Sequence, residues 1–120
     1  MSKNLITNLE RIARNTGGTN DALSNQTLSL ANTAVVALTV PANARWATIK
    51  FESAVPASAT DSTRVARYWL DGTTPTATTG IVVAHLDIIT VGETKNLNRM
   101  KIYSAIGAST TLVAQIQYYK

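Results

Sequence analysis

Apolar and polar residues alternate along most of this chain, at the spacing that β-strands require. In residues 46–53, Ala47, Ile49 and Phe51 alternate with a threonine, a lysine and a glutamate. Because successive side chains of a strand point to opposite faces, this pattern predicts a strand with one buried face. The same alternation, with β-branched and aromatic residues, predicts strands at residues 27–30, 33–40, 46–53, 64–70, 81–84, 85–91, 99–104 and 110–119.

Turn-forming residues separate the predicted strands. Pro41 ends the second strand, and the pair Asp71-Gly72 follows the fourth. Asp-Gly is a strong turn signal because glycine accepts a positive φ. Short strands at intervals of roughly ten residues are typical of sandwiches and barrels. We therefore expect an all-β fold, an antiparallel β-sandwich or jelly roll formed by residues 27–120.

The first residues follow a different period. Leu5, Leu9 and Ile12 recur at i, i+4 and i+7 with Ile6 beside them, and a pair of glycines follows. This spacing predicts an amphipathic helix that ends at the glycines. We expect residues 1–26 to form a helical arm and linker. A helix this short needs a docking surface, either on its own β domain or on a neighbouring subunit.

Composition and charge narrow the function classes. Of the 120 residues, 45 % are apolar and 15 % are charged, and the formal net charge is +4. This length suits a single core. The basic residues are scattered rather than clustered on one element, so we expect them to solubilise the surface and to bind no specific nucleic acid. They include Arg45, Lys50, Arg64, Arg67, Arg99 and Lys101.

The sequence lacks cysteines and long apolar runs, and both absences indicate the cellular compartment in which the protein folds. The chain contains no cysteine, which excludes disulfides, thiolate metal sites and a cysteine nucleophile. No apolar run has the length of a signal peptide or of a membrane span. We therefore expect a protein without a membrane partner that is synthesised and folded in a cytoplasm.

No group of residues has the spacing of a catalytic or metal site. His85 and Asp87 lie at i and i+2 of one predicted strand, where they could share a metal or act as acid and base. A surface histidine beside an acid is the simpler interpretation. Residues 61–63 and Asp71 offer oxygen ligands for calcium but match no EF-hand loop, and no Gly-x-Ser-x-Gly nucleophile motif occurs. We expect no enzyme activity, no metal and no cofactor.

The aromatic residues form a candidate contact surface. Trp46, Trp69 and Tyr103 lie on predicted strands, as does Tyr68. Aromatic rings bury much apolar area at interfaces and stack on sugars and bases. They could pack in the core, form a subunit interface or bind a glycan. Glycan binding is the least favoured of these roles.

Three segments resemble small phage and prophage proteins of a β-sandwich family. The segment YWLDGTTPTATTG at residues 68–80 resembles an aromatic-x-x-DGTxPTAxxG turn of that family. The strand VALTVPA at residues 36–42 resembles the strand that precedes this turn, and QYYK at residues 117–120 resembles the aromatic-rich end. The likeness spans residues 33–120.

The resemblance implies a structural protein of the virion, most often a head decoration or cement protein and less often a neck, tail or fibre component. Such a protein would bind the major capsid protein and copies of itself at the head surface, as a trimer or another small symmetric oligomer. Leu5, Ile6, Leu9 and Ile12 are then the candidate residues of an arm that reaches a neighbouring subunit. A carbohydrate-binding module for host attachment is the alternative from a different class.

Overall fold

The computed structural model describes residues 21–54, 64–106 and 110–120, and within them the chain forms eight strands and one short helix. The elements are β1 (Ala22–Ala31), β2 (Val35–Ala37), β3 (Trp46–Ser53), β4 (Arg64–Trp69), β5 (Ile81–Ala84), β6 (Ile88–Gly92), α2 (Thr94–Arg99), β7 (Lys101–Ser104) and β8 (Thr111–Tyr119). The prediction of an all-β fold is confirmed. The predicted strands at 46–53 and 81–84 have the observed bounds, and the others differ at one or both ends.

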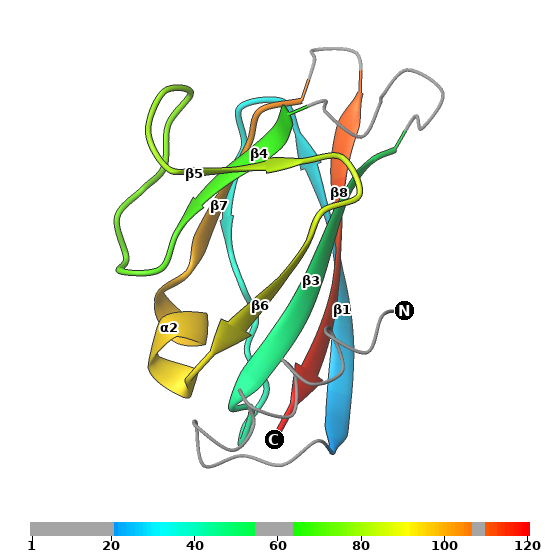
Figure 1. Cartoon of the computed structure of the whole chain (residues 1–120), viewed down its shortest axis with the longest axis vertical. Helices are drawn as coiled ribbons and strands as arrows, with labels where there is room; N and C mark the ends of the chain where they lie inside the picture. Colours follow the sequence, from blue (N-terminus) through cyan, green and yellow to red (C-terminus); the bar gives the residue numbers. More distant parts are fainter. Residues whose placement is uncertain (1–20, 55–63, 107–109) are drawn as a thin grey trace.

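The strands form two four-stranded antiparallel sheets, in the orders β1-β8-β3-β6 and β2-β7-β4-β5. Figure 1 shows the two sheets lying one against the other. Strands β1 to β4 pair with β8 to β5 in reverse order. As a result β5 and β6 are the edge strands on one side of the molecule, and β1 and β2 are the edge strands on the other.

Side chains between the sheets form one hydrophobic core. The alternation predicted for β3 is confirmed, since Ala47, Ile49 and Phe51 are all fully buried. Strand β8 alternates in the same way and directs Leu112, Ala114, Ile116 and Tyr118 inward. The other sheet contributes further buried residues, among them Val65, Ala66, Val83 and Ile102.

A bulge in β4 adds a side chain to this core. The pairing between β4 and β5 shifts between Arg64 and Ala66, so Val65 is an extra residue on β4. A bulge of this kind can turn two successive side chains to the same side of a strand. Val65 and Ala66 are both 0 % exposed, although strict alternation would have placed one of them outside.

Strand β1 is longer than the sequence pattern predicts. It begins at Ala22, so residues 22–26, which were expected in the linker, belong to a sheet. Their serine, asparagine and glutamine side chains conceal the pattern, because on this edge strand only Leu30 is buried. The predicted helix with Leu5, Ile6, Leu9 and Ile12 lies outside the described residues.

Helix α2 was not predicted from the sequence. It has six residues, and Leu97, 0 % exposed, is the one that it buries. The Thr94 hydroxyl ties the first turn to the body by donating a hydrogen bond of 2.7 Å to the Ala44 carbonyl. A helix this short has too few turns to show an amphipathic period, so tertiary contacts decide its formation.

Candidate functional site

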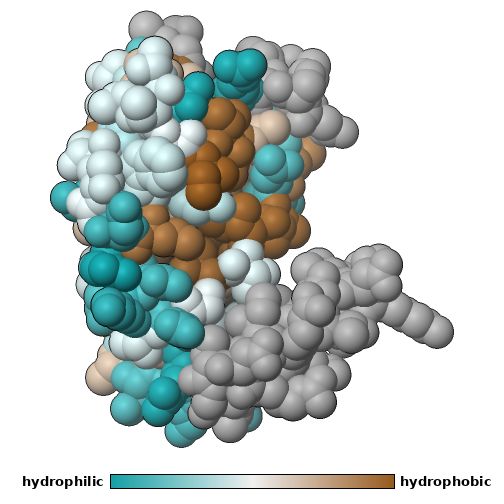
Figure 2. Space-filling view, turned by 60° about the vertical axis from the view of Figure 1, so that its left-hand side comes forward, coloured by the Kyte–Doolittle hydropathy of each residue, from teal (hydrophilic) through white to brown (hydrophobic). Residues whose placement is uncertain are grey.

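Four large apolar side chains are exposed on the side of the molecule formed by β5, β6 and the turn between them. The exposed fractions are 46 % for Ile81, 39 % for Val82, 43 % for Leu86 and 50 % for Ile88. Figure 2 shows apolar side chains gathered on this side. We call these four residues the β5–β6 surface. The only other large apolar residue exposed in the described part of the chain is Val35, on β2 at the opposite edge.

The β5–β6 surface lies on two edge strands. Within the described residues β5 pairs only with β4, and β6 pairs only with β3. Edge strands of soluble proteins usually carry a charge or a proline that discourages pairing with another chain. The sequences of β5 (IVVA) and β6 (IITVG) contain neither. This edge therefore lacks two common features that keep a sheet from binding another protein.

The turn between the two strands holds Leu86 in an unfavourable conformation. Leu86 has a φ of 72°, in the left-handed region that glycine and asparagine adopt more readily. Its backbone N–H donates to the Phe51 carbonyl at 2.7 Å. The carboxylate of Asp87 closes the turn by accepting the Ala84 N–H at 2.8 Å. Leu86 therefore combines a strained backbone with an exposed apolar side chain.

His85 and Asp87 do not form a common ligand site. The His85 ring is 5 % exposed, and its Nδ1 accepts the Ser53 backbone N–H at 3.0 Å. The interpretation of His85 as a surface residue is therefore wrong, because the turn directs the ring toward the end of β3. Among the described residues no three His, Cys, Asp or Glu side chains could together hold a metal ion. The candidate calcium ligands at residues 61–63 lie outside that part of the chain.

The loop between β4 and β5 is held by its own polar side chains. Asp71 Oδ1 accepts the Thr73 backbone N–H at 3.0 Å, and this hydrogen bond is the main cause of the lowered pKa of the Asp71 carboxyl. Thr76 Oγ1 accepts the Thr79 backbone N–H at 3.1 Å and lies 2.7 Å from the Thr79 hydroxyl. The threonines of this loop therefore stabilise its turns.

The three predicted aromatic contact residues do not form one surface. Trp46 lies on β3, where its ring, 1 % exposed, stacks on Tyr119 at a centroid distance of 4.0 Å. Trp69 and Tyr103 lie half-buried in the other sheet, on the neighbouring strands β4 and β7. Tyr68 packs against the core, and its burial raises the pKa of its hydroxyl. In the register Tyr103 lies opposite Arg67 and Trp69 lies opposite Lys101, so the two aromatic residues share a face of this sheet but are not paired.

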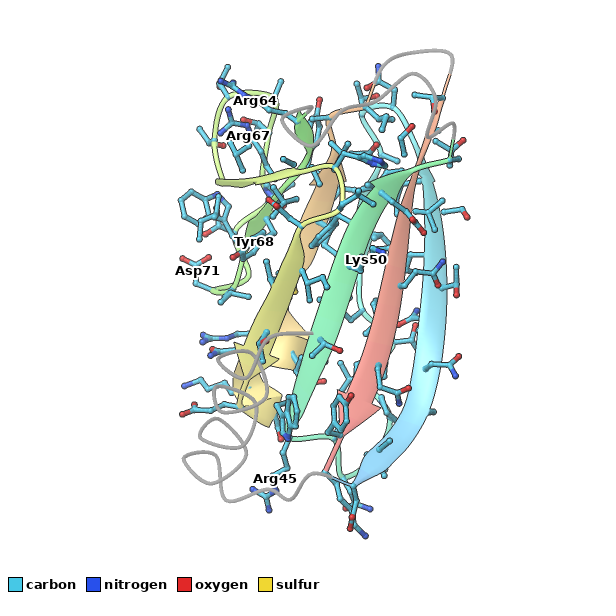
Figure 3. The ribbon with its side chains drawn as sticks, turned by 45° about the vertical axis from the view of Figure 1, so that its right-hand side comes forward. Arg45, Lys50, Arg64, Arg67, Tyr68 and Asp71 are labelled. Atoms are coloured by element: carbon cyan, nitrogen blue, oxygen red, sulfur yellow. The ribbon has the colours of Figure 1, made fainter. Side chains whose placement is uncertain are left out.

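The basic residues are spread over the described molecule. Figure 3 shows Arg45 and Arg64 at opposite ends, with Lys50 between them. Lys50 lies next to the β5–β6 surface, because it is opposite Ile88 in the pairing of β3 with β6. Asp87 precedes Ile88 in the chain and is exposed. Lys50 therefore lies beside the most exposed apolar residue, whereas the Asp87 carboxylate is hydrogen-bonded to the Ala84 N–H in the turn.

A shallow depression of about 300 Å³ lies on the outer face of the β1-β8-β3-β6 sheet. Its lining includes Thr27, Thr48, Gln115 and Gln117. The Thr27 hydroxyl donates to Gln115 Oε1 at 2.9 Å, and Gln115 Nε2 donates to Glu52 at 3.3 Å. These hydrogen bonds orient the Gln115 amide across three strands of the sheet.

Sequence reasoning did not single out the β5–β6 surface. The apolar run at 81–84 was assigned to a strand, and such a run usually means that both faces are buried. In the structure Val83 is 2 % exposed, whereas Ile81 and Val82 are open because β5 lies at a sheet edge. The signal was present in the run itself, but its interpretation requires the strand order, which one sequence does not provide.

None of the helices in the described part of the chain is long and apolar enough to cross a membrane. No family model, no curated protein and no solved structure matches the chain.

Proposed function

We propose that this chain is a structural protein of a phage virion, a head decoration or cement protein that binds the capsid surface and stabilises contacts between capsid subunits. It acts by assembly rather than by catalysis. The exposed β5–β6 surface carries this proposal, since four large apolar side chains are open to solvent on edge strands without charge or proline. Such a surface is stabilised when another protein covers it.

The pairing of the strands supports a jelly-roll form of the β-sandwich. Pairing of β1 to β4 with β8 to β5 in reverse order is what results when one long antiparallel hairpin rolls into two sheets. Jelly rolls recur in viral capsid proteins and in lectins. This support is an analogy of fold, and the function itself depends on the surface.

The resemblance of residues 68–80 to the phage turn supports the origin in a virion. In this proposal the protein is synthesised in the host cytoplasm, and its partners on the head are the major capsid protein and copies of itself. Leu5, Ile6, Leu9 and Ile12 form the arm that clamps a neighbouring subunit. A neck, tail or fibre component is the alternative position, and the location of the chain in an imaged particle decides between them.

Co-sedimentation with capsids of the phage that encodes the chain tests the proposal. We expect the full chain to pellet with the capsids, and removal of the residues before Thr19 to weaken that binding. A full chain that stays in the supernatant at all ratios would overturn the head position. Equal binding by the full chain and by the chain that begins at Thr19 would overturn the role of the arm.

Carbohydrate binding is the second candidate function, and the depression on the outer sheet face favours it. Amide and hydroxyl groups of Gln115, Gln117 and Thr27 could hydrogen-bond to a sugar there, and jelly rolls include lectins. A glycan array with the full chain, followed by titration of the strongest ligand into Gln115→Ala, tests this role. An array without any response would remove it.

A further inference from the structure

We propose that residues 3–14 pack their apolar stripe over the Trp46 side chain, on the outer face of the β1-β8-β3-β6 sheet of their own chain. The stripe is formed by Leu5, Leu9 and Ile12. The inference deepens the proposed function and rests on it in one respect, because an arm that clamps a neighbouring subunit by exchange binds the same site on that neighbour. Three observations carry it: the burial of Trp46, the reach of the other segments and the place where the chain enters β1.

Trp46 is buried on a sheet face where its neighbours are not. On β3 it alternates with Ala47, Ile49 and Phe51, whose side chains point into the core between the sheets. Its own side chain therefore points to the outer face, as do the threonine, lysine and glutamate that follow it in the same alternation. Those three are partly exposed, yet Trp46 is 1 % exposed. The indole is therefore covered from outside the sheet.

The elements beside Trp46 supply only part of this cover. Tyr119 on β8 is opposite Trp46, and its ring stacks on one face of the indole at a centroid distance of 4.0 Å and an interplanar angle of 8°. Gly92 on β6 is opposite Trp46 on the other side and has no side chain. Helix α2 follows β6, but its first residues are exposed and its buried residue, Leu97, belongs to the core between the sheets. The second face of the indole needs another segment.

That segment belongs to the same chain, because Trp46 is buried in a single copy. Outside the described residues lie 1–20, 55–63 and 107–109. The last two are attached at the far end of β3, where the Ala54 N–H donates to the Thr111 carbonyl. The length of β3 places that end roughly 25 Å from Trp46. A loop as long as 55–63, held at both ends, extends at most about 15 Å. Residues 1–20 are thus the segment within reach.

The N-terminal segment joins the body beside Trp46. Ala22, the first residue of β1, is opposite Tyr119, which in turn is opposite Trp46. Neighbouring strands lie about 4.8 Å apart, so the chain enters β1 roughly 10 Å from Trp46. Figure 1 shows the start of β1, the start of β3 and the end of β8 at the same end of the molecule. Residues 15–20 span up to about 20 Å and include two glycines, so the segment can fold back over the sheet.

The stripe has the chemistry and the length that this site requires. Residues 3–14 in a helix are about 18 Å long, which is enough to cross the four strands of the sheet. A helix this short is marginal in water without a surface to pack on. Docking of its leucine and isoleucine side chains on the Trp46–Tyr119 pair removes apolar area from water on both sides.

Tryptophan quenching in the full chain tests the proposal. Trp69→Phe leaves Trp46 as the single tryptophan, and we expect acrylamide to quench it weakly. Leu9→Asp places a charge in the stripe and should raise the quenching constant severalfold. Thr7→Asp is the matched control, because it adds the same charge about 160° away around the helix, and it should leave quenching unchanged. Equal quenching in the two variants, or strong quenching before either change, would overturn the proposal.

Cross-linking tests the position of the segment and the chain on which it lies. The chain has no cysteine, so Ala13→Cys beside the stripe and Thr48→Cys beside Trp46 together introduce one pair of thiols. We expect a short bis-maleimide to join them within one chain in the free protein. In the control pair Ser29→Cys replaces Thr48→Cys, because Ser29 lies toward the other end of the same sheet, and we expect no product. A product that joins two chains would overturn docking on the same chain, as would equal results for the two pairs.

These measurements can be separated from the proposed function. If the segment covers Trp46 in a chain that binds no capsid, the docking site stands and the decoration role fails. If acrylamide reaches Trp46 freely while capsid binding still depends on residues 1–18, the docking site fails and the arm keeps its role on the particle.

Discussion

Ser104 illustrates, at the scale of one residue, a buried polar group without compensation. Its side chain is 0 % exposed on β7, and its hydroxyl has no hydrogen-bond partner among the described residues. A buried hydroxyl that lacks a partner costs about 1–3 kcal/mol. We expect Ser104→Ala to raise the free energy of unfolding by about 1 kcal/mol, measured by urea denaturation. A large loss of stability would instead indicate a partner for the hydroxyl.

A substitution at Leu86 should change stability and assembly in opposite directions. Asparagine adopts the left-handed conformation of this position more readily than leucine does. We therefore expect Leu86→Asn to raise the free energy of unfolding by about 1 kcal/mol. It also removes an apolar side chain from the β5–β6 surface, so the proposed binding to the capsid should weaken. Parallel denaturation and co-sedimentation measurements check both effects, and a less stable variant would contradict the strain.

At the scale of elements, the loop of residues 71–80 depends on a close approach at Gly80. Gly80 has a φ of 122°, and a Cβ there would lie 3.0 Å from the Arg67 Cβ and 3.1 Å from the Pro75 Cβ. We expect Gly80→Ala to lower the free energy of unfolding by about 2 kcal/mol through strain and crowding.

Gly72 provides the control for this prediction. It also has a positive φ, of 89°, but no atom lies within 4 Å of the position of its Cβ. Gly72→Ala should therefore cost only the backbone strain, about 1 kcal/mol, and thermal unfolding of both variants compares the two. Equal losses would show that crowding at Gly80 contributes nothing.

The elements also show why only part of the fold could be predicted from the sequence. Strand β3 was predicted with the observed bounds because one face is buried and the other carries threonine, lysine and glutamate. The predicted 33–40 strand shrinks to three residues in β2, because little of this edge strand pairs with its neighbour. Helix α2 escaped prediction because a single buried residue, Leu97, leaves no period to detect.

Less of the candidate site than of the fold could be predicted from the sequence. Leu86 lies in a turn that was predicted as part of a strand, because Leu86 and Ile88 alternate with His85 and Asp87. Its exposure depends on the left-handed φ of the turn and on the position of β5 and β6 at sheet edges. Both are consequences of pairing between distant segments, which local patterns do not contain.

At the scale of the whole molecule, the first and last strands of the described chain pair with each other. β1 pairs with β8 from Ala22 to Ala31, and the Lys120 backbone N–H donates to the Asp21 carbonyl at 3.0 Å. The Tyr118 hydroxyl adds a side-chain link, since it donates to Gln26 Oε1 at 2.7 Å. Contacts between segments this far apart in sequence form late and at high entropic cost, so the closing strands depend on the intact core.

The buried hydroxyl of Tyr118 should make the stability of the molecule sensitive to alkaline pH. Burial raises the pKa of the Tyr118 hydroxyl to about 12, whereas the value in an unfolded chain is about 10. Because the folded pKa is the higher one, the contribution of the neutral hydroxyl is complete below pH 10 and is lost as the pH rises toward 12. The free energy of unfolding should therefore fall by about 1 kcal/mol between pH 9 and pH 11 through this group.

Urea denaturation at the two pH values measures this fall, and Tyr118→Phe is the variant that isolates it. Phenylalanine keeps the ring but has no proton to lose, so the variant should be less stable than the parent at pH 9, through loss of the hydrogen bond to Gln26, and should lose less stability by pH 11. Tyr68 contributes in the same direction, because burial raises its pKa as well. An equal fall in parent and variant would place the alkaline sensitivity elsewhere and leave the closing strands independent of the Tyr118 proton.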